Sequence, residues 1–325
     1  MTVLGFPSGF PRTVFFFTLA AMEQILGHAA LLEVLERATA HPAPGYALHG
    51  PDGVGKRLVA RYFAGLLLKT DPAQLAGHPD FAVLARQDGE KNIKVEAVRD
   101  LVGRMQLTAA MGGCKVALIE DAESMNEQGM NALLKAVEEP EGRAVFLFVT
   151  EQPERLPATL RSRLALMTLL PVRKEDIKAW LVADGADGAL AEELAEACRG
   201  CPGLARRMRE DLDEYRRRRA QATAFLRVLA DEPDGRQVGE IERLAKTLQS
   251  ADDPARAWQA FLSECERLAP SVLVEPARLS RFGEALIHAR QTAGGAVSPA
   301  LALEWGVVGQ YHTGDVPVFL HPPYL

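Results

Sequence analysis

The chain contains 325 residues, of which 48% are hydrophobic and 25% are charged. This length predicts two or three domains, and this composition excludes a disordered or collagen-like chain. The net charge of −6 argues against a protein that grips DNA by itself, because such proteins are usually basic. The four cysteines are too few for a disulfide scaffold, so we expect a cytoplasmic protein in a reducing compartment.

The first 21 residues do not have the pattern of a folded domain. Their apolar run, Val14–Ala21, is far shorter than the roughly 20 residues that span a bilayer. With Arg12 before it and Leu19-Ala20-Ala21 at its end, the run is also compatible with a signal peptide. Met22 then opens a segment that is typical of a domain start. We therefore expect residues 1–21 to be a disordered or misannotated extension.

Helical and apolar strand patterns alternate between residues 22 and 170. This alternation predicts an α/β core, with a parallel sheet covered by helices on both faces. The expected helices span residues 29–40, 58–69, 95–106 and 126–139, and the expected strands span 46–49, 81–84, 115–119, 145–149 and 164–169.

The strand patterns stop after residue 170. Short helical patterns predict a small helical segment over residues 171–210. Residues 215–325 have apolar positions at helical spacing, which predicts an all-α domain. These positions include Leu226, Leu229, Ile241, Leu244, Leu248, Trp258, Phe261 and Leu262. We expect the tail, residues 312–325, to be irregular.

A glycine-rich loop follows the first expected strand and opens a helix. The segment from Gly50 to Lys56 fits G-x-x-x-x-G-K, the phosphate-binding P-loop, in the strand–turn–helix context that this motif requires. Gly50, Gly53 and Gly55 allow backbone N–H groups to turn toward phosphate oxygens. Lys56 adds a full positive charge at the helix N-terminus.

Two departures argue against efficient ATP hydrolysis. A Ser or Thr hydroxyl normally ligates Mg²⁺ at position 57, whereas Arg57 cannot ligate a cation. Either nucleotide binds here without a well-placed magnesium, or the loop keeps its shape and no longer binds nucleotide. The strand over 115–119 ends in Glu120-Asp121, a Walker B-like pair in reversed order. Asp121 is one methylene too short to orient an attacking water.

Several longer segments match one family. Residues 131–140 read Asn-Ala-Leu-Leu-Lys-Ala-Val-Glu-Glu-Pro and are similar to the N-A-L-L-K-x-x-E-E-P signature of bacterial clamp-loader subunits. Residues 150–163 resemble the sensor 1 segment of these proteins, which runs into Ser-Arg-Cys; here Leu164 replaces the cysteine. Gly77–Phe81 resembles their H-P-D segment, and Met22–His28 their adenine-side segment. The predicted core thus resembles the AAA+ ATPases of the clamp-loader family.

Within that family the chain resembles the δ′ subunits of DNA polymerase III. The ATP-hydrolysing γ/τ subunits carry an intact G-K-[ST] and a zinc-binding cysteine cluster, and this chain has neither, with no cysteine between Arg57 and Cys114. The turn Gly200–Gly203 lacks a sensor 2 arginine and resembles the Gly-Ser-Pro-Gly of δ′. The resemblance implies no zinc, doubtful ATP binding and little or no ATPase activity of the chain's own.

The resemblance also implies a role in replication. A δ′ subunit of the DNA polymerase III holoenzyme would be the stator of a ring formed with γ/τ and δ. That ring loads the sliding clamp onto primed DNA, and no membrane is involved. By this resemblance, residues 171–210 would form a helical lid and residues 215–325 a helical collar that oligomerises. Arg163 would be the catalytic residue of the subunit, an arginine finger that reaches ATP in a neighbouring subunit. Thr150 would be the sensor 1-like residue.

Other interpretations remain open on the residues alone. The chain could be a stand-alone or homo-oligomeric AAA+ ATPase that remodels nucleoprotein, a γ/τ subunit, or a scaffold in which Arg163 only braces an interface. Cys198–Cys201 forms a C-x-x-C, which we interpret as part of a helix-to-helix turn because no second pair accompanies it. We interpret Arg216–Arg219 as a solvated helix face, and His49 as a packing residue at a strand end.

Overall fold

The computed structural model describes residues 25–87, 90, 92–111, 113–139, 143–231, 234–251, 253–292, 299, 300 and 303. The expected extension over residues 1–21 and the expected irregular tail over residues 312–325 lie outside the described residues. The chain divides into two compact units, the first ending at Arg207 and the second beginning at Met208. The finer division into core, lid and collar stays a prediction. In the part of the chain that is described, every helix is too short or too polar to cross a bilayer.

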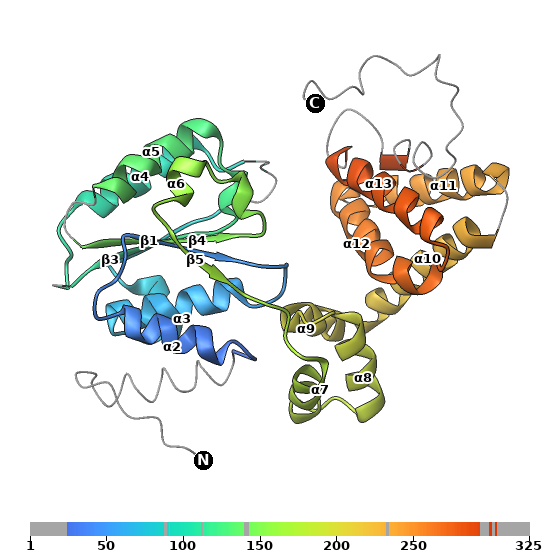
Figure 1. Ribbon diagram of the computed structural model, residues 1–325, viewed down its shortest axis with the longest axis horizontal. Helices are drawn as coiled ribbons and strands as arrows, with labels where there is room; N and C mark the ends of the chain where they lie inside the picture. Colours follow the sequence, from blue (N-terminus) through green and yellow to red (C-terminus); the bar gives the residue numbers. More distant parts are fainter. Residues whose placement is uncertain are drawn as a thin grey trace. The chain divides into compact units, whose positions relative to one another are not determined.

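A five-stranded parallel sheet forms the centre of the first unit, in the order β2-β3-β4-β1-β5. Helices α2 and α3 cover one face, and α4, α5 and α6 cover the other (Figure 1). The strands are β1 (Gly45–His49), β2 (Phe81–Leu84), β3 (Lys115–Ile119), β4 (Ala144–Thr150) and β5 (Ala165–Thr168). The helices are α2 (Ala29–Ala38), α3 (Lys56–Leu68), α4 (Val95–Gln106), α5 (Glu127–Glu138) and α6 (Ala158–Arg161), with short 3-10 turns at Pro72–Gly77, Ala122–Ser124 and Pro153–Arg155. The predicted α/β core with a parallel sheet is confirmed.

The central strands are apolar on both faces because each face packs against helices. Successive side chains of a strand point to opposite faces, so alternate residues enter different clusters. In β3, Val116 and Leu118 join the cluster beneath α2 and α3, whereas Ala117 and Ile119 join the cluster beneath α4 and α5. The uninterrupted apolar run that predicted this strand therefore serves two cores at once.

Local residues set where the helices begin. Asn126 caps α5, because its Oδ1 accepts a hydrogen bond from the backbone N–H of Gly129 at 2.9 Å. The helix expected over 58–69 begins two residues earlier, at Lys56. Its N-cap, Gly55, has a φ of 113°, a left-handed conformation that glycine adopts without a steric penalty.

Three short helices follow the sheet: α7 (Lys174–Ala183), α8 (Gly188–Ala197) and α9 (Pro202–Glu210). Ile177 and Leu181 of α7 and Leu194 of α8 are fully buried. The turn before α9 lies against the end of the core, because the Val172 N–H donates to the Gly200 oxygen at 2.8 Å. A Cβ on Gly200 would lie 2.5 Å from the Pro171 Cβ, so this approach requires glycine.

The second unit is helical in its described part. It contains α10 (Leu212–Asp231), α11 (Asp234–Gln249), α12 (Pro254–Val272) and α13 (Pro276–Thr292), which share one hydrophobic core. Phe225 of α10 packs edge-on against Phe261 of α12, with ring centroids 5.5 Å apart. The predicted helical C-terminal region is confirmed, and the apolar positions that predicted it are buried in this core.

Candidate nucleotide site and arginine finger

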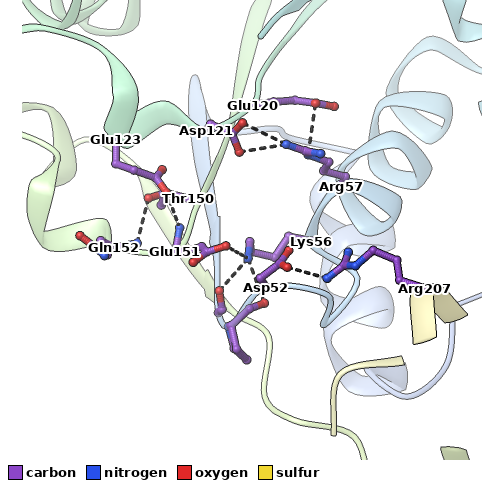
Figure 2. Close-up of polar contacts among 12 residues, drawn as sticks. Asp52, Lys56, Arg57, Glu120, Asp121, Glu123, Thr150, Glu151, Gln152 and Arg207 are labelled. Atoms are coloured by element: carbon purple, nitrogen blue, oxygen red, sulfur yellow. Dashed lines mark hydrogen bonds and ion pairs between the residues drawn. The ribbon is translucent and has the colours of Figure 1, made fainter. Parts of the chain in front are cut away.

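Three strand ends meet at one edge of the sheet. The P-loop follows β1, Glu120 and Asp121 follow β3, and Thr150 ends β4. Since β4 pairs in parallel with both β1 and β3, their carboxyl ends lie side by side. This is the edge at which open α/β sheets bind ligands. Figure 2 shows the predicted nucleotide-site residues Lys56, Arg57, Glu120, Asp121 and Thr150 gathered there.

Lys56 points back into its own loop. Its Nζ donates to the carbonyl oxygens of Gly50 at 2.7 Å and Pro51 at 2.9 Å, and lies 3.9 Å from a carboxylate oxygen of Glu151. Burial of the ammonium lowers the pKa of Lys56, and the nearby carboxylates, first Glu151 and then Asp52, oppose that shift. Burial also raises the pKa of Glu151, with Lys56 opposing it.

Arg57 stands where a magnesium ligand was expected. Its guanidinium donates to both carboxylate oxygens of Asp121, at 2.9 and 3.1 Å, and lies 3.2 Å from an oxygen of Glu120. Asp121 has a φ of 51°, an unusual left-handed conformation for a residue other than glycine. Both carboxylates that could hold Mg²⁺ are thus bound by a cation of the chain itself, and these residues do not fit a magnesium ion.

Helix α9, in the segment that we expect to form a lid, contacts the P-loop at two points that the sequence did not reveal. The Gly203 N–H donates to the Gly53 oxygen at 2.8 Å, and Arg207 forms an ion pair with Asp52 at 2.6 Å (Figure 2). No local pattern could have found the second contact, because its partners lie 155 positions apart in the chain.

The hydroxyl of Thr150 is turned toward its own chain. Thr150 is buried, and its Oγ1 accepts a hydrogen bond from the Gln152 N–H at 3.1 Å. The next residue, Glu151, donates its backbone N–H to Glu123 at 3.1 Å. Glu151 therefore faces Lys56 with its side chain while its backbone fixes the turn after β4. Neither Glu151 nor Glu123 is among the site residues that the sequence predicted.

Arg163 lies between α6 and β5. Its guanidinium is 2.7 Å from a carboxylate oxygen of Glu138, and it donates to the Thr159 carbonyl oxygen at 2.7 Å. The side chain is still 43% exposed. Glu138 belongs to the segment 131–140 that matched the family signature, so two motifs that are separate in sequence meet here.

We interpret the C-x-x-C segment, His49 and the run Arg216–Arg219 as structural features. Cys198 and Cys201 are buried thiols, and burial raises the pKa of Cys201 to about 11. Among the described residues, no cluster of histidine, cysteine or carboxylate side chains could hold a metal ion. His49 contacts the Thr168 hydroxyl at 2.9 Å across neighbouring strands. Two arginines of the run over residues 216–219, Arg217 and Arg218, pair with Glu214.

Known proteins are similar to this chain over its core. The family described as "DNA polymerase III, delta subunit" matches residues 27–173. The DNA polymerase III subunit delta′ of Pseudomonas aeruginosa is 41% identical over 173 residues, which cover 49% of this chain and 51% of that protein. The DNA polymerase III subunit tau of Escherichia coli K12 is 33% identical over 179 residues, 52% of this chain and 27% of that protein. The chain thus spans about half the length of its delta′ relative.

A solved structure supports the fold. A DNA polymerase III gamma subunit-related protein of Thermotoga maritima superposes with a TM-score of 0.53 at 17% identity, covering 85% of this chain and 97% of that one. The resemblance to clamp-loader AAA+ proteins is therefore confirmed in the fold and in the core sequence. Residues 27–173 are thus similar to the delta′ subunits of DNA polymerase III, which is the resemblance that the sequence motifs predicted.

Proposed function

We propose that this chain acts as the δ′ subunit of a clamp loader, together with γ/τ and δ subunits, and helps to load the sliding clamp onto primed DNA. One observation carries the proposal. Arg57 pairs with Glu120 and Asp121, the two carboxylates expected to hold magnesium, while Arg163 stays 43% exposed at a surface. Such a subunit would contribute to hydrolysis in a neighbour and not in itself.

Arg163 is the residue that would make this contribution. A guanidinium offered in trans neutralises charge that develops on the transferred phosphoryl group, and in other NTPases it accelerates hydrolysis by about 10³ to 10⁵. The ion pair with Glu138 and the hydrogen bond to Thr159 hold the guanidinium in one orientation before a neighbour arrives. Preorganisation of this kind reduces the cost of ordering the side chain in the complex.

The test uses the assembled complex. The purified chain is mixed with γ/τ and δ, the stoichiometry is measured by native mass spectrometry, and the ATPase rate is measured with clamp and primed DNA. We expect Arg163→Ala and Arg163→Lys to assemble normally and to lower the stimulated ATPase rate partially, because other interfaces of the ring keep their own arginines and lysine lacks the planar fork.

A matched control is Arg37→Ala, since Arg37 is also exposed and also pairs with a glutamate, Glu33. This control should leave the ATPase rate unchanged. Assembly with a wild-type ATPase and clamp-loading rate in Arg163→Ala would contradict the trans role and favour the scaffold. Failure of the chain to join γ/τ and δ at all would contradict the clamp-loader assignment.

A further inference from the structure

The lid and the P-loop touch backbone to backbone. The Gly203 N–H, in the first turn of α9, donates to the Gly53 carbonyl oxygen at 2.8 Å. A Cβ on Gly203 would lie 3.0 Å from that oxygen, and a Cβ on Gly53 would lie 2.9 Å from the Leu204 nitrogen. A side chain at either position would push the two backbone segments apart, so glycine at both positions favours this close approach.

An ion pair reinforces the same contact. Arg207 follows Gly203 by four residues in α9, so the two lie on one face of the helix. Its guanidinium binds Asp52, which lies inside the P-loop, at 2.6 Å. A lid arginine near a P-loop could otherwise bind the phosphate of a ligand. Here its anionic partner is a carboxylate of the loop itself.

The cations of the loop also have partners within the chain. Lys56 binds two carbonyl oxygens of the loop and faces Glu151, and Arg57 binds Glu120 and Asp121. In these ion pairs, three cations face four carboxylates. The cations are Lys56, Arg57 and Arg207, and the carboxylates are Asp52, Glu120, Asp121 and Glu151. The resulting excess of negative charge disfavours a polyphosphate at this site.

We propose that the P-loop of this chain is a docking surface for its own lid, on which Asp52 and the Gly53 carbonyl hold α9 in place without nucleotide or magnesium. The lid position is then a fixed property of the chain, not a response to a ligand. This proposal does not depend on the clamp-loader assignment, since it concerns contacts inside one chain.

Hydrogen–deuterium exchange of the full-length chain tests the first part. The amides of residues 201–207, which include the Gly203 N–H bound to Gly53, are followed with no addition, with Mg²⁺, with ATP, and with both. We expect the four exchange rates to agree within about twofold. A slowing of about tenfold or more with ATP and Mg²⁺ would overturn the proposal, because the lid would then respond to nucleotide.

Variants test the contact itself. In Asp52→Asn and Arg207→Gln, exchange over residues 201–207 should rise about two- to fivefold, the range expected for an exposed ion pair. In Gly203→Ala it should rise further, about tenfold. Alanine favours helix more than glycine does, so faster exchange would report the clash with Gly53 and not a weaker helix.

The control variant is Arg173→Gln, which removes an ion pair with Asp176 that lies within the lid. Its exchange over residues 201–207 should match the wild type. The strand β4 amides should stay protected in every variant, which shows that the sheet is intact. If Gly203→Ala does not fold, the two ion-pair variants decide the question. Wild-type exchange in every folded variant of Asp52, Gly203 and Arg207 would overturn the proposal.

Discussion

Asp80 links two loops of the core through one buried side chain. Its carboxylate oxygens accept the backbone N–H groups of Ala110 at 2.7 Å and Met111 at 2.8 Å, just before β3. Burial would raise the pKa of Asp80, but these two hydrogen bonds outweigh it and lower the pKa. The His-Pro-Asp segment that matched the family therefore has a structural task in this chain.

Asp80→Asn should lower the free energy of unfolding by about 1–3 kcal/mol at pH 7, because an amide cannot accept both hydrogen bonds as a carboxylate does. The folded pKa of Asp80 is depressed, so its contribution is present above the ordinary value of 3.8 and is lost as the pH falls through the folded pKa. Urea unfolding at several pH values measures this. An equal loss for the exposed control Asp100→Asn would contradict the prediction.

The ion pairs of Arg57 with Glu120 and Asp121 predict that the isolated chain does not hydrolyse ATP. The isolated chain should release phosphate from ATP at the background rate, and Lys56→Ala should not change that rate, because the carboxylates that would hold Mg²⁺ are bound by Arg57. A phosphate-release assay with an active γ/τ subunit as positive control measures it. A turnover of about 1 s⁻¹ that disappears in Lys56→Ala would refute this.

The sequence predicted which residues come together at the P-loop edge of the sheet. It did not predict the ion pairs that Asp52 and Arg163 form with distant residues. Gly50–Arg57 and Glu120-Asp121 follow apolar strands, and carboxyl ends of parallel strands meet at one edge, so their neighbourhood follows from pattern alone. The pair Asp52–Arg207 depends on where α9 packs, and the pair Arg163–Glu138 depends on where α6 packs. Tertiary contacts of this kind leave no local signal in the chain.

At the scale of elements, strands were easier to place than helix ends. The apolar runs of β3 and β4 are unmistakable because both faces of the sheet are covered. Helix ends depend on caps: α3 begins at Lys56 because Gly55 turns the chain, and α5 begins after Asn126 because its side chain binds the Gly129 N–H. Apolar periodicity carries no information about either event.

Removing the cap of α5 gives a test at this scale. Asn126→Ala should destabilise the chain by about 1 kcal/mol, since the Gly129 N–H loses its acceptor, whereas Asn126→Ser should retain most of the stability. Urea unfolding of the two variants measures the difference. Equal stability of the alanine and serine variants would show that the capping hydrogen bond contributes nothing.

At the scale of the whole molecule, the second unit has its own hydrophobic core, in which Phe225, Trp258 and Phe261 pack together. A chain cut after Asp211 should therefore keep a folded first unit, with its sheet intact by circular dichroism. We expect it to lose the ability to form a complex with γ/τ and δ subunits, measured by size-exclusion chromatography. Co-elution of the shortened chain with those subunits would show that another surface drives assembly.

The burial of the thiols has a practical consequence for labelling. Cys198, Cys201 and Cys265 are buried, and burial raises the pKa of the half-buried Cys114, so little reactive thiolate is present at neutral pH. A cysteine introduced at the exposed Ala179 of α7 should therefore react with a maleimide dye far faster than the native thiols. Fluorophores could then be attached at one chosen position in the otherwise unaltered chain.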